Sequence, residues 1–324
     1  MLYPVFLKEN DLIGISALSS GVGHKIKSFD ESLDYLKSFY FNFVETDSVR
    51  NDSEPSTNAK QRVLELNHLI CDDSTKAIWC AAGGDFQFET LPYIDFDVIS
   101  KNPKWYLGAS DPTNLLFPIT CKCDIATIYG FNAGSFDAYG QNEYTAQLFQ
   151  FLKGENHSIH SSLYHQRVDY YNDGKPVLNM ETIYDGCCDV EGRILGGCFE
   201  SISDMAGTPY DFVDEFLERY KKDSIIWFFD IFSMNSCDVY RALLKMKYMG
   251  YFKYTETILV GRVLFENVSD LLDYKEAFKR ALPWVNCIFE TDIGHTYPHY
   301  YVINGSMTKI VVLDGKSEIK YILK

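Results

Sequence analysis

The sequence has few of the features that mark nucleic-acid-binding or membrane proteins. Its 30 Lys and Arg residues are outnumbered by 45 Asp and Glu residues, which gives a formal net charge of −15. No cluster of basic residues stands out, although binding to nucleic acid or to anionic lipid depends on such clusters. Lys8 and Glu9 fall too early for the apolar core of a signal peptide, and no run reaches transmembrane length. We therefore expect a cytoplasmic protein without a nucleic-acid or membrane partner.

Patterns that would hold a metal or a dinucleotide are missing too. None of the nine cysteines lies in the C-x-x-C spacing of a zinc site, so we expect reduced thiols that are mostly buried. His157, His160 and His165 have no evident carboxylate or fourth ligand, which favours surface histidines over a metal site. The G-x-G-x-x-G spacing of dinucleotide-binding turns is absent as well. We expect no cofactor and no metal.

The sequence does contain enough apolar residues for one large or two modest domains. Of its 324 residues, 46% are hydrophobic and 15% are aromatic, as in folded globular proteins. In the first half, short apolar runs predict strands at 12–18, 77–80 and 105–107, with helical patterns between them. Ser28 and Glu31 form a capping box, which predicts the start of one such helix.

Strands that alternate with helices predict a parallel sheet, with functional residues at the carboxyl ends of its strands. Three loops should therefore converge at that edge, namely 19–21, 83–84 and 108–110. Gly83 and Gly84 would allow backbone N–H groups to approach a ligand closely, although a plain strand-to-helix turn explains them equally well.

Ser110 lies in a turn between an apolar strand and a helix for which Pro112 is a suitable first-turn residue. A strand, a tight turn with one serine and a helix are the elements that present a nucleophilic hydroxyl above an α/β sheet. The helix N-terminus would offer N–H groups and the positive end of a dipole to an oxyanion. The second glycine usual in such turns is replaced by Asp111-Pro112, so an ordinary helix-capping serine is the simpler interpretation of the spacing alone.

Two further residues follow apolar strands in the second half. Asp230 comes directly after the run 224–229, and His295 stands in the loop after the run 285–289. A serine hydrolase needs a base within hydrogen-bond reach of its nucleophile and a carboxylate that orients this base. An imidazole, with an ordinary pKa of about 6.5, can take up and return a proton. Taken singly, a strand-end carboxylate and a structural loop histidine explain the two residues as well.

Several short segments together resemble a known protein family, which Ser110, Asp230 and His295 alone would not reveal. The central one is Gly-Ala-Ser-Asp-Pro-Thr at 108–113, close to a G-x-S-D-x-T signature. In order along the chain, the segments are 11–15, 83–84, 91–97, 102–104, 108–113, 192–197, 207–210, 240–250 and 294–296. Together they resemble the LD-carboxypeptidase family of serine peptidases, which includes muramoyl-tetrapeptide carboxypeptidases and microcin C self-immunity proteins.

The resemblance implies an α/β protein in two parts. A flavodoxin-like, parallel-sheet N-terminal domain would be followed by a smaller, β-rich C-terminal domain, with the site between them. We assign residues 1–165 to the nucleophile-bearing domain, 166–190 to a linker, and 191–324 to the domain that bears the acid and the histidine.

The resemblance also implies a catalytic triad. Ser110 corresponds to the family's nucleophile and His295 to its base. The family's acid is normally Glu, whereas this chain has Asp230, which is shorter by one carbon–carbon bond of about 1.5 Å. Either the backbone shifts so that Asp230 still reaches His295, or the triad is weakened.

The implied oxyanion donors are the N–H groups of Asp111 and of Gly83 or Gly84. The residues beside the glycine pair and the segment 127–132 resemble the immunity branch more than the peptidoglycan-recycling branch. The implied function is a serine carboxypeptidase or amidase that acts, as a homodimer, on a small carboxylate-bearing peptide or peptidyl-nucleotide. The alternative is a catalytically impaired homologue that binds such a ligand without efficient turnover.

Overall fold

The computed structural model describes residues 1–135, 143–172 and 175–323, and the chain divides into two units. The chain leaves the first unit, builds most of the second, and returns once to the first before it ends in the second. The first unit comprises residues 1–156 and 301–305, and the second comprises residues 157–300 and 306–324.

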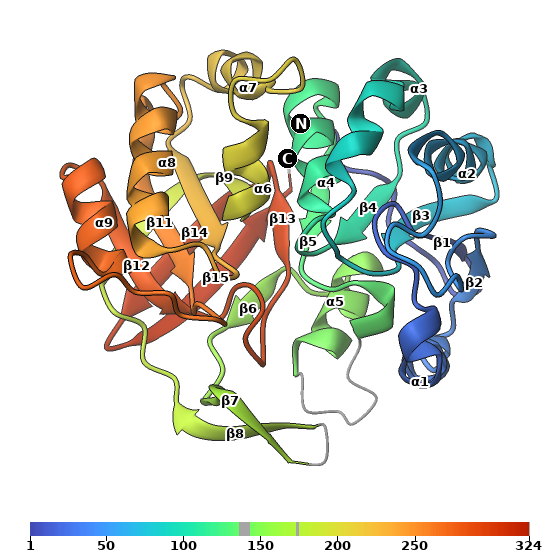
Figure 1. Ribbon diagram of the computed structural model, residues 1–324, viewed down its shortest axis with the longest axis horizontal. Helices are drawn as coiled ribbons and strands as arrows, with labels where there is room; N and C mark the ends of the chain where they lie inside the picture. The colour runs from blue at the N-terminus through green and yellow to red at the C-terminus, as the bar shows by residue number, and fades with distance from the viewer. Residues whose placement is uncertain (136–142, 173–174, 324) are drawn as a thin grey trace. The chain divides into compact units, whose positions relative to one another are not determined.

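The first unit is built on a six-stranded sheet with the strand order β13-β5-β4-β3-β1-β2 (Figure 1). Strands β1 to β5 run parallel, and β13 pairs antiparallel with β5. The order 2-1-3-4-5 is that of flavodoxin-like folds, so the fold predicted for this part of the chain is confirmed. The strands are β1 (Leu12–Ser16), β2 (Asn42–Glu45), β3 (Thr75–Cys80), β4 (Trp105–Gly108), β5 (Thr127–Tyr129) and β13 (Val302–Asn304).

The central strands of this sheet are apolar on both faces. Ile13 of β1, Ile78 of β3 and Trp105 of β4 are almost completely buried. Such continuous burial is typical of parallel strands that helices cover on both sides. The helices of the unit are α1 (Ile26–Lys37), α2 (Ala59–Cys71), α3 (Phe96–Lys101), α4 (Thr113–Pro118) and α5 (Tyr144–Leu152).

The capping box predicted at Ser28 and Glu31 is wrong. Helix α1 begins two residues before Ser28, and no side chain caps its N-terminus. The physical reason is a 3₁₀ turn, Gly23–Lys25, which leads directly into the helix and supplies its first turn.

The second unit contains a seven-stranded sheet with the order β12-β11-β10-β9-β14-β15-β6, and a separate hairpin of β7 and β8 (Figure 1). Strands β9 to β12 run parallel, whereas β14, β15 and β6 are antiparallel. This sheet confirms the predicted β-rich second part. The strands are β6 (Ser158–His160), β7 (Tyr164–Asn172), β8 (Lys175–Glu181), β9 (Cys188–Cys198), β10 (Ile225–Asp230), β11 (Thr255–Gly261), β12 (Asn286–Thr291), β14 (Met307–Leu313) and β15 (Lys316–Ile322).

The segment 166–190, assigned to a linker from the sequence, carries regular structure. It contains β8, most of β7 and the first residues of β9. Strand β9 pairs with β10 on one side and β14 on the other, so this segment folds with the second unit. For this reason the unit starts near residue 157, and the two units are of similar size.

Helix α8 (Ser236–Tyr248) has a capping residue at its start and a glycine just past its end. The Asn235 side chain accepts a hydrogen bond from the N–H of Cys237 at 2.9 Å, as an N-cap does. Gly250, with a φ of +88°, follows the last turn, as is common for a glycine that ends a helix. Val239, Leu243 and Met246, which follow one another at helical spacing, are buried.

The remaining helices of the second unit are short. They are α6 (Phe199–Met205), α7 (Val213–Arg219) and α9 (Tyr274–Ala281). Even α2 and α8 have only thirteen residues each. In the described ranges, no helix combines the length and the apolar character that crossing a membrane demands.

Arg62 of α2 connects this helix to two loops at the carboxyl edge of the first sheet. Its side chain is fully buried. One guanidinium nitrogen donates to the carbonyl of Leu18 at 2.6 Å and to that of Phe86 at 3.1 Å, and the other pairs with Glu89. Leu18 follows β1 and Phe86 follows β3, so one cation fixes the loops on both sides of the point where the strand order reverses.

Replacing Arg62 by Met should destabilise the first unit, because two buried carbonyls would lose their donor. The expected loss in the free energy of unfolding is about 2 kcal/mol or more. Urea denaturation measures it. Lys60→Met, at an exposed position of the same helix, is the control and should change stability by about 0.5 kcal/mol or less. Equal stability of the two variants would contradict this role.

Candidate active site

Ser110 stands at the turn between β4 and α4. Its φ is +68°, which is uncommon for a residue other than glycine. Its carbonyl accepts a hydrogen bond from the N–H of Thr113 at 2.9 Å, which closes the turn into the helix. The strand, tight turn and helix predicted around this serine are therefore present, with a strained backbone at the serine itself.

The end of β5 and the residues that follow it hold this turn in place. Asn132 binds Ala109 twice, accepting from its N–H at 3.0 Å and donating to its carbonyl at 3.1 Å. The N–H of Ser110 donates to the hydroxyl oxygen of Tyr129 at 3.1 Å. These three bonds fix the backbone on the N-terminal side of the serine.

The carboxylate of Asp111 joins the three loops that were predicted to converge. It accepts hydrogen bonds from the hydroxyl of Ser19, the N–H of Gln87 at 2.8 Å and the side-chain amide of Asn114 at 2.7 Å. In addition, the N–H of Ser20 donates to the carbonyl of Gly83 at 3.2 Å. The predicted convergence of the loops after β1, β3 and β4 is confirmed. Burial raises the pKa of Asp111 despite these hydrogen bonds.

Gly83 lies directly against the serine. A Cβ built at this glycine would lie 3.1 Å from the Cβ of Ser110 and 3.3 Å from its Oγ. Gly84, with a φ of +136°, is packed against Ser20. Within the described part of the first unit, the N–H groups of Gly83, Gly84 and Asp111 have no hydrogen-bond acceptor. They are therefore available as donors.

Asp230 and His295 form a hydrogen-bonded pair in the second unit. Nδ1 of His295 lies 2.8 Å from Oδ2 and 2.9 Å from Oδ1 of Asp230. The carboxylate is fully buried, whereas 18% of the imidazole side chain is exposed. Because a carboxylate can only accept, Nδ1 carries the proton, and Nε2 is left as the basic nitrogen. The shorter acid of this chain thus does reach its histidine.

The loop that carries His295 is fixed by a buried arginine and by a glycine. Arg262 donates to Asp292 at 2.5 Å, to Thr296 at 3.2 Å and to the carbonyl of Glu290 at 3.0 Å. Gly294 has a φ of +98°, and a Cβ there would collide with the carboxylate of Asp230. The loop can approach the buried acid only because this residue has no side chain.

The environment of His295 favours its protonated form. Burial lowers the pKa of His295, but the charge of Asp230, the hydrogen bond to it and the charge of Glu200 together outweigh this effect. The net result is a pKa raised above the ordinary value. The ring of Phe232 also packs on the imidazole, with ring centroids 4.6 Å apart.

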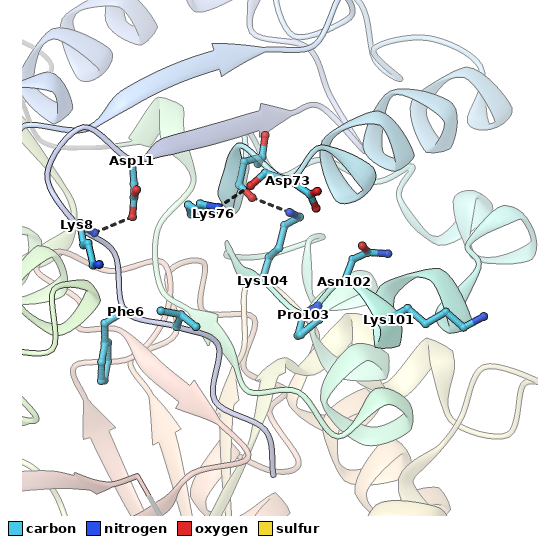
Figure 2. A pocket seen from close by; sticks show the side chains of 11 residues that line it. Phe6, Lys8, Asp11, Asp73, Lys76, Lys101, Asn102, Pro103 and Lys104 are labelled. Atoms are coloured by element: carbon cyan, nitrogen blue, oxygen red, sulfur yellow. Dashed lines mark hydrogen bonds between the residues drawn. The ribbon is translucent and has the colours of Figure 1, made fainter.

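A cavity of about 420 Å³ lies at the opposite edge of the first sheet (Figure 2). Asp11, Thr75 and Lys104 line it, next to the amino ends of β1, β3 and β4. The Lys104 amine donates to the carbonyls of Asp72 at 3.0 Å and Thr75 at 2.6 Å. Ser110 and the glycine pair follow the carboxyl ends of the strands, so this cavity does not belong to the candidate active site.

The predicted site residues thus form two groups. Ser110, Asp111, Gly83 and Gly84 lie together in the first unit. Asp230 and His295 lie together in the second. Sequence reasoning missed Arg262, although a charged residue directly after an apolar strand is the signal that singled out Asp230.

Comparison with known proteins assigns both parts of the chain. The LD-carboxypeptidase N-terminal domain matches residues 13–130, and the LD-carboxypeptidase C-terminal domain matches residues 191–310. A Vibrio cholerae protein that is named as a carboxypeptidase is 28% identical over 280 residues. These residues are 82% of this chain and 81% of that protein. The microcin C7 self-immunity protein MccF of Escherichia coli is 26% identical over 221 residues, 63% of each chain.

Solved structures share the fold. MccF in complex with aspartyl sulfamoyl adenosine superposes with a TM-score of 0.83 at 21% identity, covering 100% of this chain and 99% of that one. A muramoyltetrapeptide carboxypeptidase from Oxalobacter formigenes has a TM-score of 0.74 at 18% identity, covering 96% and 98%.

Replacing Asp230 by Asn should lower the pKa of His295, because a neutral amide stabilises the imidazolium less than a carboxylate does. Histidine C–H resonances followed by NMR through a pH titration measure this, with His295 assigned from its missing signal in His295→Ala. Asp238→Asn, at an exposed position of α8, should leave the titration unchanged. An unchanged pKa in Asp230→Asn would show that the carboxylate does not set the charge state.

Replacing Gly83 by Ala should crowd Ser110 without unfolding the protein. We expect the serine to react with a fluorophosphonate about tenfold or more slowly, since small displacements near a reacting atom have large effects on rate. Gly250→Ala is the matched control: its φ of +88° strains the new residue, but nothing lies within 4 Å of the added Cβ. It should lower the Tm and leave labelling unchanged; if Gly83→Ala behaves in the same way, the close approach is irrelevant to reactivity.

Proposed function

This chain belongs to the LD-carboxypeptidase family, and from that premise we propose that it is a serine peptidase or amidase. It would hydrolyse an amide bond in a small, carboxylate-bearing peptide or peptidyl-nucleotide. The observation that carries the proposal is the bond between the buried Asp230 and Nδ1 of His295, since it leaves Nε2 free to act as a base. The strained turn at Ser110 supports the assignment of the nucleophile.

In the first step, Oγ of Ser110 attacks the amide carbonyl while its proton passes to Nε2 of His295. Asp230 stabilises the imidazolium that forms. The carbonyl oxygen becomes an oxyanion, which the N–H groups of Asp111 and of Gly83 or Gly84 stabilise. This step requires that Ser110 and His295 come within hydrogen-bond distance in the working enzyme.

The intermediate then collapses. His295 returns the proton to the leaving nitrogen, the carbon–nitrogen bond breaks, and the acyl group remains as an ester on Ser110. A water molecule gives its proton to Nε2 of His295 and attacks this ester. The second collapse releases the carboxylic acid and restores the hydroxyl of Ser110, so that one water is consumed for each amide cleaved.

For the substrate, we favour an aminoacyl sulfamoyl nucleotide over a murein tetrapeptide. MccF, a structural relative, is seen in complex with such a nucleotide, and the segment 127–132 resembles the immunity branch. Incubation of the enzyme with each compound, followed by chromatography of the products, distinguishes the two. The cytoplasmic location expected from the sequence and the homodimer implied by the resemblance stay predictions.

The alternative function, a homologue that binds its ligand without efficient turnover, was based on the shorter acid. Asp230 reaches His295, so this substitution no longer argues for an impaired enzyme. The alternative is therefore retained only as one outcome of the following experiment.

A fluorophosphonate should label wild-type protein at Ser110, and Ser110→Ala and His295→Ala should reduce labelling by about 10³-fold or more. Only unprotonated His295 can act as the base, and its pKa is raised. The labelling rate should therefore fall with decreasing pH, with a midpoint above the ordinary histidine value of about 6.5. Ser100→Ala, at an exposed position of α3, should be labelled like wild type. Folded wild-type protein that stays unlabelled would indicate the binding homologue instead.

A further inference from the structure

Glu200 organises the loop that follows the buried acid. It lies in the first turn of α6, next to β9 in the sequence. Its Oε1 accepts hydrogen bonds from three consecutive N–H groups, those of Phe232, Ser233 and Met234, each at 3.0 Å. These three residues begin two positions after Asp230, so a single carboxylate oxygen fixes the path of the chain as it leaves β10.

That loop supports the imidazole. Phe232 packs on the ring of His295 with centroids 4.6 Å apart, and on the ring of Phe265 with centroids 5.1 Å apart. The N–H of Phe265 donates to the carbonyl of Phe232 at 3.1 Å, and the hydroxyl of Tyr274 donates to the carbonyl of Met234 at 2.8 Å. The face of the imidazole therefore rests on a loop that is held from both sides.

Glu200 also acts on His295 through its charge. The pKa of His295 is lowered by burial and raised by Asp230 and, more weakly, by Glu200, with a net increase. Two other titratable groups lie nearby. Burial lowers the pKa of His299 to about 4, so His299 is neutral near pH 7. The thiol of Cys198 donates to Oε2 of Glu200 at 3.4 Å, and burial raises its pKa, so it is neutral as well. Two carboxylates therefore set the charge state of the imidazole, and they come from different elements, β10 and α6.

We propose that Glu200 is a positioning residue for the base: its carboxylate holds the loop 232–234 against His295, and its charge stabilises the imidazolium formed during proton transfer. This role rests on the proposed function, because it takes His295 to be the base. Glu200 itself makes no contact with the reacting atoms in this mechanism and acts through Phe232 and through the field at the imidazole.

Two substitutions separate the two contributions. Glu200→Gln keeps the length of the side chain and an oxygen that can accept from the three N–H groups, but it removes the charge. Glu200→Asp keeps the charge but is shorter by about 1.5 Å, too short to serve all three N–H groups. Glu318→Gln, at an exposed position of β15, is the control for the loss of one surface carboxylate.

The first measurement is the NMR titration of His295 in the free protein, which needs neither substrate nor activity. His295 should titrate at lower pH in Glu200→Gln than in wild type. In Glu318→Gln it should titrate as in wild type. The second is the rate of fluorophosphonate labelling, which Glu200→Asp should reduce by about 10- to 100-fold because the support of the imidazole is displaced. Near-native Tm values confirm that both variants are folded, and if one is not, the other still tests its own contribution.

The outcomes distinguish this role from the proposed function. If wild-type protein is labelled, but the titration in Glu200→Gln and the labelling of Glu200→Asp both match wild type, the positioning role is overturned and the hydrolase assignment stands. If wild-type protein is not labelled, the hydrolase assignment fails, and the titration alone decides whether Glu200 acts on His295. A lower His295 pKa in Glu200→Gln with slower labelling of Glu200→Asp establishes both contributions.

Discussion

The arrangement of the second unit depends on one contact, in which the fully buried carboxylate of Asp230 binds one nitrogen of the His295 imidazole. A charge removed from water needs a partner and hydrogen bonds, and Asp230 finds them in His295. The histidine can come this close because Gly294 has no side chain to collide with the acid. A second buried acid in the same loop, Asp292, is neutralised by Arg262. Removing any of these partners would leave an uncompensated charge in the interior.

In the first unit, the main requirement is to hold the strained turn at Ser110. A non-glycine residue with positive φ persists only where the surroundings determine it more than once. At Ser110 they do so through Tyr129 and Asn132 on one side and through the carboxylate of Asp111 on the other. Arg62 then fixes the neighbouring loops from behind. Ser110 is thus positioned by the same residues that stabilise the carboxyl edge of the sheet.

Local patterns predicted much of this arrangement, and long-range contacts explain the rest. The parallel sheet, the turn at Ser110 and the order of Ser110, Asp230 and His295 follow from apolar runs and the residues that end them. The start of α1 was missed because a preceding 3₁₀ turn, not a side chain, begins the helix. The hydrogen bonds of Arg262 and Glu200 join residues about thirty positions apart. No spacing rule within one element could have revealed them.

Strand β13 belongs to the first unit, although the chain on either side of it belongs to the second. Only a few residues after His295, the chain contributes this strand to the edge of the first sheet and then returns to finish the second sheet. A gene cut at the boundary near residue 157 would separate the first sheet from one of its own strands. Joining the first half to a different second half at that boundary would therefore leave one edge of the first sheet without its strand.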